Sequence, residues 1–200
     1  EKDLDITVAR SSGPGGQNMM TGIANCYFDS TPCIFLTGQV ATRFMTPKGS
    51  ALRQLGFQEW DPVQAVKGIT KYARTVMSAE EIGWTMDQAL HLASAGRPGP
   101  VLVELPNDVQ RQAVDAASLT RWTPEAAPYA DPQRAAGAFL SDLAAAQRPG
   151  ILVGGGAFKA RAAILDFAAA RQIPVFRTWN ALDICPDDHP CFAGTVGTYG

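Results

Sequence analysis

The sequence predicts an α/β fold with parallel sheets, organised as two consecutive partial domains. Short apolar runs bounded by glycine or proline alternate with stretches of helical periodicity, a pattern typical of parallel α/β sheets. Residues 115–132 interrupt this alternation with alanine, threonine, charged residues and three prolines, which predicts an extended linker. We therefore expect one domain in residues 1–114, the linker in 115–132, and a second domain in 133–200.

Apolar runs in the first domain predict three strands, at 6–9, 33–36 and 101–105. Helical spacing of apolar residues predicts helices at 18–29 and 80–95, and another helix is expected to begin at residues 62–66. The helix at 80–95 has the clearest pattern, because Ser78 can cap its start and Gly96 can end it. Residues 41–56 mix charge, proline and glycine, and predict a surface loop with a short helix.

The second domain is predicted to be Rossmann-like. Strands are expected at 150–153 and 173–176, and helices at 133–147 and 159–171. The order strand, glycine-rich turn, helix, strand is that of a dinucleotide-fold half. Its turn is Gly154-Gly155-Gly156, and the chain ends where such a domain still needs strands.

Composition excludes several classes of partner. Hydrophobic residues make up 46% of the 200 residues, charged residues 18%, and the net charge is −2, as in an ordinary soluble globular protein. A slightly negative net charge does not predict binding to nucleic acid or to an anionic membrane. No apolar stretch approaches the ~20 residues that are needed to span a bilayer. The four cysteines lack metal-ligand spacing, so we expect reduced thiols, no metal site and a cytoplasmic location.

The segment Gly13-Pro14-Gly15-Gly16-Gln17-Asn18 carries the most information. Glycines and a proline between a strand and a helix let the backbone approach a ligand and leave free N–H groups at the helix start. The spacing matches neither the phosphate loop nor the dinucleotide fingerprint. Taken alone, it fits a ligand-binding turn and a tight structural turn equally well.

Further motifs follow in order: Thr37-Gly38-Gln39, Phe57-Gln58-Glu59, Ile69-Thr70-Lys71 and Gly96-Arg97-Pro98-Gly99-Pro100-Val101. With the glycine turn, this series resembles the pyrimidine-binding domain of thiamine-diphosphate enzymes of the acetolactate synthase and benzoylformate decarboxylase superfamily. The resemblance implies a decarboxylase or carboligase, with thiamine diphosphate and Mg²⁺ as cofactors and a small 2-oxo acid as substrate. It also implies a homo-oligomer with active sites shared between subunits.

The resemblance assigns roles to particular residues. Phe57 and Gln58 are expected to face the reacting centre, where an amide can donate to an oxygen of the 2-oxo acid; the alternative is a loop whose phenylalanine fills the core. Lys71 is expected near the substrate channel, or else is a solvated surface charge. Five residues are expected to line the aminopyrimidine site of the cofactor: Gly13, Pro14, Gly15, Asn18 and Gln39.

In the second domain, the residues that match the family's central domain are Gly154, Gly155, Gly156 and Thr178. In the superfamily this domain holds FAD, ADP or no nucleotide. The triple glycine fits a phosphate contact and tight helix–strand packing equally well. Trp179-Asn180 departs from the small apolar residues of FAD-binding members.

Two parts of the family's machinery have no counterpart in these 200 residues: the upstream glutamate that activates the coenzyme, and the Gly-Asp-Gly motif that binds Mg²⁺ and diphosphate. We therefore expect a fragment that is inactive alone. Residues 41–56 form a longer loop than in the commonest acetolactate synthases, so the particular 2-oxo acid is not assigned. The alternative function is a non-catalytic nucleotide-binding or assembly module, and an NAD-linked dehydrogenase is disfavoured because no acidic residue follows Gly156 at the required distance.

The helix after the glycine turn carries more apolar residues than one core-facing stripe requires. We expect this excess to form a face that meets a partner subunit. The residues concerned are Met19, Met20, Ile23 and Phe28.

Overall fold

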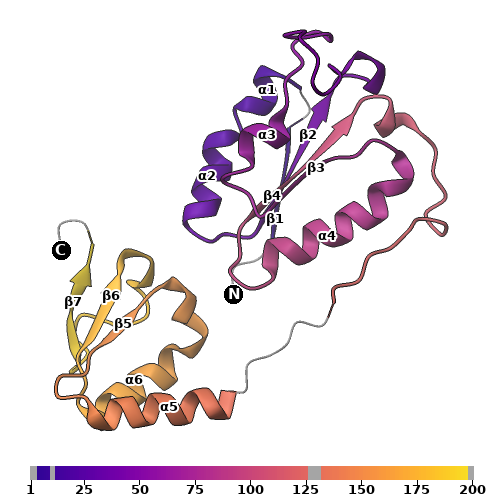
Figure 1. Ribbon diagram of the computed structural model, residues 1–200. Coiled ribbons are helices and arrows are strands. Elements are labelled where there is room, and N and C mark those ends of the chain that lie inside the picture. The colour runs from indigo at the N-terminus through magenta and orange to yellow at the C-terminus, as the bar shows by residue number, and fades with distance from the viewer. Residues whose placement is uncertain (1–3, 10–11, 126–131, 198–200) are drawn as a thin grey trace. The chain divides into compact units, whose positions relative to one another are not determined.

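The structure is a computed structural model that describes residues 4–9, 12–125 and 132–197. The chain divides into two compact units, one from Lys2 to Ala126 and the other from Ala127 to Gly200. Figure 1 shows both units. The division falls within the expected linker 115–132, while the domain bounds themselves stay a prediction.

The first unit contains a four-stranded parallel sheet with the strand order β1-β2-β4-β3 (Figure 1). All three predicted strands are present and each is longer than its apolar run, whereas the strand at Tyr72–Thr75 was not predicted. Because all strands are parallel, their carboxyl ends lie at one edge of the sheet. The strands are β1 (Asp5–Ala9), β2 (Cys33–Gln39), β3 (Tyr72–Thr75) and β4 (Pro100–Pro106).

Helices cover both faces of the central strands. Ile34 on β2 packs with helix α4 (Ile82–Ser94) on one face. The next residue, Phe35, packs with helices α2 (Met20–Phe28) and α3 (Pro62–Val66) on the other. Successive side chains of a strand point to opposite faces, and an apolar run without alternation is therefore buried on both sides.

The predicted helix at 18–29 is present as α2, which begins two residues later, at Met20. A separate short helix, α1 (Pro14–Gln17), lies in the segment predicted to be a turn. The expected partner-facing excess of apolar residues on this segment is largely wrong. Met19 and Ile23 belong to the buried core, and Met20 packs against it. Of the four residues named in that prediction, only Phe28 is exposed, at 69%.

The prediction that Ser78 caps the helix at 80–95, which is α4, is also wrong. The chain enters α4 through a 3-10 turn, Ala79–Glu81, and the Ser78 side chain makes no capping hydrogen bond. The positive φ of Gly96 follows the end of α4, as predicted.

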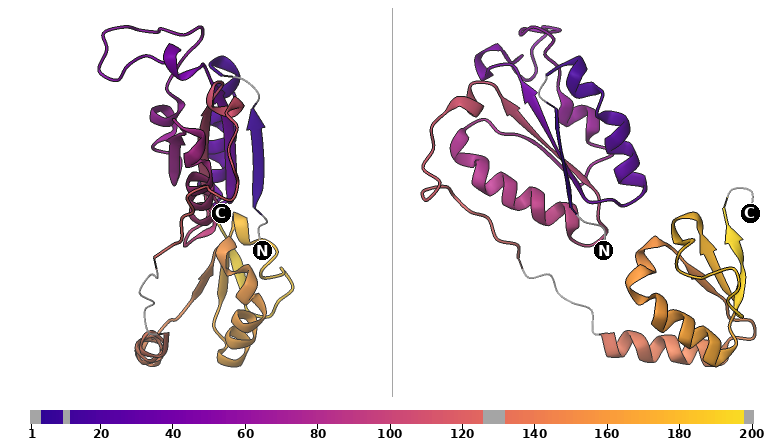
Figure 2. Two further views of the ribbon diagram at one scale, coloured as in Figure 1. Left: turned by 90° about the vertical axis from the view of Figure 1, so that its right-hand side faces the viewer. Right: turned by 180° about the vertical axis from the view of Figure 1, so that it is seen from behind.

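The second unit contains a three-stranded parallel sheet with the order β5-β6-β7. Its strands are β5 (Ile151–Val153), β6 (Val175–Thr178) and β7 (Phe192–Val196), and its helices are α5 (Pro132–Ala145) and α6 (Arg161–Arg171). Val153, Val175 and Ala168 form the centre of its core. Figure 2 shows both units from two further sides. In the described part of the chain, no helix is long and apolar enough to cross a bilayer.

Candidate functional site at the carboxyl edge of the first sheet

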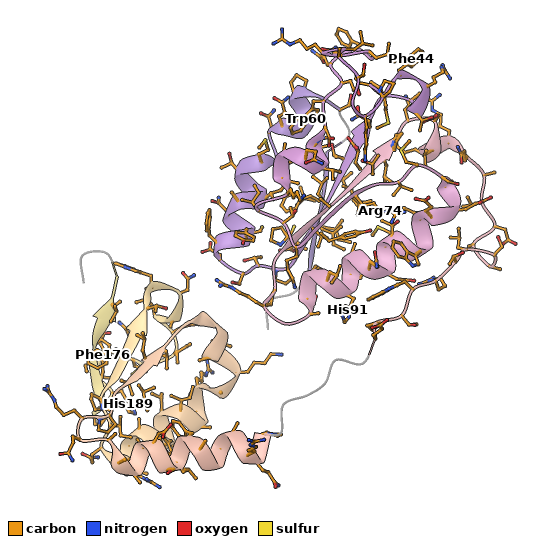
Figure 3. All side chains as sticks on the ribbon, in the orientation of Figure 1. Phe44, Trp60, Arg74, His91, Phe176 and His189 are labelled. Carbon is orange, nitrogen blue, oxygen red and sulfur yellow. The ribbon has the colours of Figure 1, made fainter. Side chains whose placement is uncertain are left out.

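The predicted cofactor and substrate motifs of the first unit, apart from Lys71, gather at the carboxyl edge of its sheet. The glycine turn follows β1, and Gln39 is the last residue of β2. The segment 41–56 extends beyond the strand ends (Figure 2), and Phe44 and Trp60 lie at this end of the unit in Figure 3. Ligands of parallel α/β sheets bind at the carboxyl ends of the strands, so this edge is the candidate site.

The structure brings Gly13 and Gln58 into direct contact. A Cβ added at Gly13 would lie 2.2 Å from the Gln58 carbonyl oxygen, which is closer than a carbon atom and a non-bonded oxygen atom can approach. Gly13 also has φ +56°, a conformation that favours glycine. Only glycine therefore lets the turn after β1 meet the loop that carries Gln58.

The side chains of this loop face solvent. Phe57 is 82% exposed, so the alternative in which its ring fills the core is wrong. Gln58 is exposed and has φ +55°, which is uncommon for a residue with a side chain. Pro14 and Asn18 are likewise exposed, with Gly15 half-buried between them. Side chains held outward at a strand-end edge are available to a ligand.

Gln39, by contrast, is engaged within the protein. Its Nε2 donates to the Trp60 carbonyl oxygen at 2.8 Å and to Glu104 Oε1 at 2.6 Å. Its Oε1 accepts from the Val40 N–H at 2.9 Å. Both Nε2 hydrogens are therefore used, and the amide as placed has none left for a ligand.

Glu104, on β4, is a residue of this edge that sequence reasoning missed. It is 1% exposed and accepts from Gln39 Nε2 and, at 2.6 Å, from Thr75 Oγ1 at the end of β3. Burial raises the pKa of its carboxyl to about 7, against the hydrogen bonds from Thr75 and Gln39, and the nearby Asp61 and Glu59 raise it further. The available signal was a single acid within the apolar run Val101–Leu105.

Glu59 organises the loop that precedes it. Its carboxylate accepts hydrogen bonds from the N–H and hydroxyl groups of Thr46 and from the N–H groups of Leu55 and Gly56. Partial burial works against ionisation, but these hydrogen bonds outweigh it and lower the pKa of Glu59. The glutamate of Phe57-Gln58-Glu59 is therefore a structural anchor.

Lys71 does not join these residues. Its N–H donates to the Pro100 carbonyl at the first residue of β4, whereas Gln39 pairs with Pro106 at the last. Six residues of strand separate the two levels, roughly 20 Å. Lys71 Nζ donates to the Ala95 carbonyl at 2.6 Å, and burial lowers its pKa. Its place near a substrate channel stays a prediction.

The two histidines have local structural contacts. The His91 ring lies 5.3 Å from the ring of Trp122, and His189 Nδ1 accepts from the Cys191 N–H; both histidines are labelled in Figure 3. Among the described residues, no group of three or more His, Cys, Asp or Glu could hold a metal ion.

In the second unit, the glycine turn again meets other strand ends. A Cβ at Gly155 would lie 2.7 Å from the Asn180 carbonyl oxygen, which explains this glycine by packing. Gly154 lies beside Thr178 Oγ1, 3.9 Å from its added Cβ, whereas nothing lies within 4 Å at Gly156. The turn continues into a 3-10 helix, Gly155–Ala160, before α6 begins.

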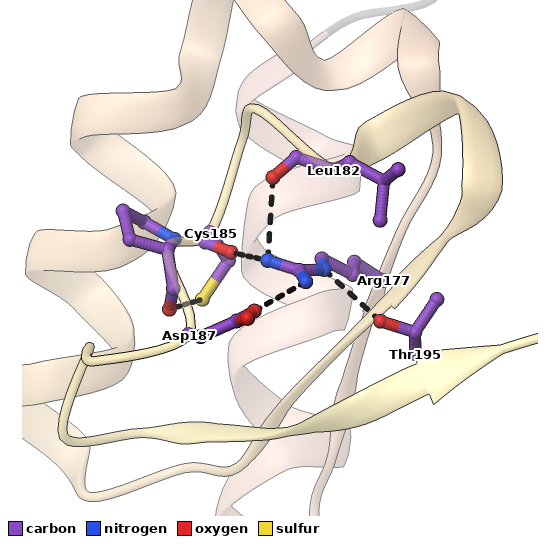
Figure 4. A network of polar contacts seen from close by, with 6 residues as sticks. Arg177, Leu182, Cys185, Asp187 and Thr195 are labelled. Carbon is purple, nitrogen blue, oxygen red and sulfur yellow. Dashed lines mark hydrogen bonds and ion pairs between the residues drawn. The ribbon is translucent and has the colours of Figure 1, made fainter.

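Arg177, on β6, organises the loop that follows this edge (Figure 4). It is 7% exposed, pairs with Asp187, and donates to the carbonyl oxygens of Leu182 and Cys185. Its Nε donates to Thr195 Oγ1 at 3.1 Å. These contacts use four of the five N–H groups of Arg177, so the guanidinium serves mainly to hold this loop.

Family models match both units. Residues 6–65 match the N-terminal TPP-binding domain of thiamine pyrophosphate enzymes, and residues 137–200 match the central domain of the same enzymes.

Curated relatives agree with these matches. The chain is 35% identical to the large subunit of acetolactate synthase isozyme 2 from Escherichia coli K12, over 95% of the chain and 33% of that protein. It is 35% identical to a probable acetolactate synthase large subunit from Methanocaldococcus jannaschii, over 95% of the chain and 32% of that protein. A glyoxylate carboligase from Escherichia coli O157:H7 is 36% identical over 94% of the chain and 31% of its own length. The chain thus spans about a third of the length of these relatives.

Proposed function

This chain belongs to the superfamily of thiamine pyrophosphate enzymes, and from that premise we propose that it is part of a thiamine-diphosphate-dependent decarboxylase or carboligase of 2-oxo acids. The carboxyl edge of the first sheet lines the aminopyrimidine and the substrate. The contact between Gly13 and Gln58 is the observation that supports this most directly, because it joins the expected cofactor turn to the expected substrate loop.

The residues at this edge fit the pyrimidine end of thiamine diphosphate. Gly13 and Gly15 let the backbone come close, and Asn18 and Gln58 present exposed amide groups. A flat heteroaromatic ring needs such close approach and one or two fixed polar partners. We assign Mg²⁺ and the diphosphate to a part of the full-length protein outside these 200 residues.

When bound, thiamine diphosphate supplies the nucleophilic carbon and the electron sink for loss of CO₂. The Gln58 amide donates to the keto oxygen of the 2-oxo acid, where negative charge develops. The exposed Phe57 ring, beside it in sequence, shields the reacting atoms from water. Gln39 supports this loop through Trp60 and does not itself contact the cofactor.

For the second unit we propose that the carboxyl edge holds the adenosine diphosphate group common to ADP and FAD. Gly156 leaves open backbone there, and Trp179, 65% exposed, offers a face for a planar ring. A homo-oligomer with shared active sites and a cytoplasmic location complete the proposal. The alternative, a non-catalytic nucleotide-binding or assembly module, predicts nucleotide binding without turnover.

The test is CO₂ release from pyruvate and glyoxylate by the full-length protein with thiamine diphosphate and Mg²⁺. Turnover supports the enzyme, and its absence with nucleotide binding retained supports the alternative. Gln58→Ala should then lower kcat on the order of 10²-fold with a smaller effect on cofactor binding, because one donor to the developing charge is lost.

Gln64→Ala is the matched control, an exposed glutamine on α3 that should leave kcat unchanged. An unchanged kcat in Gln58→Ala would remove Gln58 from the mechanism.

A further inference from the structure

We propose that Glu104 is a positioning residue for the reaction: through the Gln39 amide it fixes the segment 57–60, and with it the side chain of Gln58. The kinetic part of this inference rests on the proposed function. The structural part rests on hydrogen bonds within the first unit alone.

The Gln39 amide is the link between the sheet and the loop. Its two Nε2 hydrogens are shared between Glu104 Oε1 at 2.6 Å and the Trp60 carbonyl at 2.8 Å, while its Oε1 accepts from Val40. Turning the amide over would place its oxygen against two other oxygens and its nitrogen against a donor. The amide therefore has one orientation, and Glu104 helps to enforce it.

The segment 57–60 depends on such an anchor. Phe57 and Gln58 are exposed, so their side chains add little packing, and Gln58 is held at φ +55°. A residue with a side chain keeps that conformation only where its surroundings impose it. On one side Gly13 contacts Gln58, and on the other the Trp60 carbonyl is held by Gln39.

Glu104 is itself held firmly. Thr75 Oγ1 bonds its second carboxyl oxygen at 2.6 Å, and its backbone carbonyl accepts from the Val76 N–H at 2.9 Å. The charged groups that face it are the carboxylates of Asp61 and Glu59. No described residue forms an ion pair with Glu104. Its surroundings thus use it as a hydrogen-bonding group rather than as a charge.

This distinction gives a sharp kinetic test in the full-length protein. Glu104→Gln keeps an acceptor for Gln39 and a donor for Thr75, and should retain kcat within about twofold. Glu104→Leu and Gln39→Met remove the link, and each should lower kcat on the order of tenfold with KM changed far less, as for the loss of one buried hydrogen bond. The double variant should be no slower than the slower single variant, because both act through one chain of contacts.

Glu81→Gln is the matched control, since Glu81 pairs with Arg74 at the start of α4. It should leave kcat unchanged. Equal losses in Glu104→Gln and Glu104→Leu would overturn the inference, as would full activity in a folded Glu104→Leu.

Amide hydrogen exchange supplies a readout that does not need activity. Gln39→Met and Glu104→Leu should raise exchange at residues 57–60 with little change in α4, and Glu104→Gln should not. If the wild type releases no CO₂, the proposed function fails while this measurement still decides the structural inference. If Glu104→Leu does not fold, Gln39→Met decides it, and unchanged exchange at residues 57–60 in that variant overturns it.

Discussion

Each unit buries an ionisable side chain on an inner strand of its parallel sheet, an acid on β4 in the first unit and a base on β6 in the second. Glu104 of the first unit is 1% exposed and Arg177 of the second is 7% exposed. The partners of Glu104 are the neutral side chains of Gln39 and Thr75. Arg177 instead pairs with Asp187 and donates to backbone carbonyls.

The difference follows from what each group can do when it is buried. A carboxyl can take up a proton and lose its charge, and burial moves the pKa of Glu104 to about 7 in that direction. A guanidinium stays charged at any ordinary pH and carries five donors. The second unit therefore gives Arg177 an anionic partner and several acceptors, whereas the hydrogen-bond partners of the Glu104 carboxyl are neutral donors.

The largest expected effect on stability is that of replacing Arg177. Arg177→Met should destabilise the second unit by about 4 kcal/mol, because the Leu182 and Cys185 carbonyls and the Thr195 hydroxyl lose a donor together. This loss of stability is measured by urea unfolding, with amide hydrogen exchange in strands β5 to β7 as the signal.

Two controls sharpen the result. Arg171→Met, an exposed residue of α6, should cost less than about 0.5 kcal/mol. Asp187→Asn should cost less than about 1 kcal/mol, because the Asp187 side chain is 78% exposed. If Asp187→Asn costs as much as Arg177→Met, the ion pair dominates and the carbonyl contacts do not.

The second prediction concerns Glu104, whose replacement by glutamine is expected to raise the stability of the first unit rather than lower it. The folded pKa of Glu104, about 7, lies above the ordinary value of 4.5, so the folded state binds more protons between these pH values. Stability then falls as the pH rises from about 4.5 through about 7 and is level above. Glu104→Gln lacks this loss, and should be more stable than the wild type by up to about 3 kcal/mol at pH 8 and by little at pH 5. Urea unfolding of both proteins across this range tests it, and a difference that does not change with pH would contradict it.

Sequence patterns predicted most of the architecture, because long apolar runs and helical spacing report burial directly. The helix Pro62–Val66 begins where the sequence predicted a helix to begin, whereas β2 continues past its predicted end to Gln39. Thr37 and Gln39 are polar yet buried, and no single-sequence pattern distinguishes them from loop residues. The strand β3 (Tyr72–Thr75) was not predicted at all, because its four residues mix polar and apolar side chains without an apolar run.

The site was predicted less completely. The approach of Gly13 to Gln58 joins residues 45 positions apart, and a family resemblance suggested both without showing that they touch. Glu104 and Arg177 were missed, because a charged residue in an apolar strand acquires its role only from partners on other elements. Spacing along one chain does not carry that information.

The smallest expected effects compare two adjacent glycines of the second unit. Gly155→Ala should cost about 2 kcal/mol, because the new Cβ would lie 2.7 Å from the Asn180 carbonyl and backbone must shift. Gly156→Ala meets nothing within 4 Å and should change stability by less than about 0.5 kcal/mol. Urea unfolding separates these two, and titration of the full-length Gly156→Ala protein with ADP adds a functional readout. Weaker ADP binding at unchanged stability would support a phosphate close to Gly156. ADP binding equal to that of the wild type would mean that the glycine turn serves packing only, as the contact between Gly155 and Asn180 already indicates for Gly155.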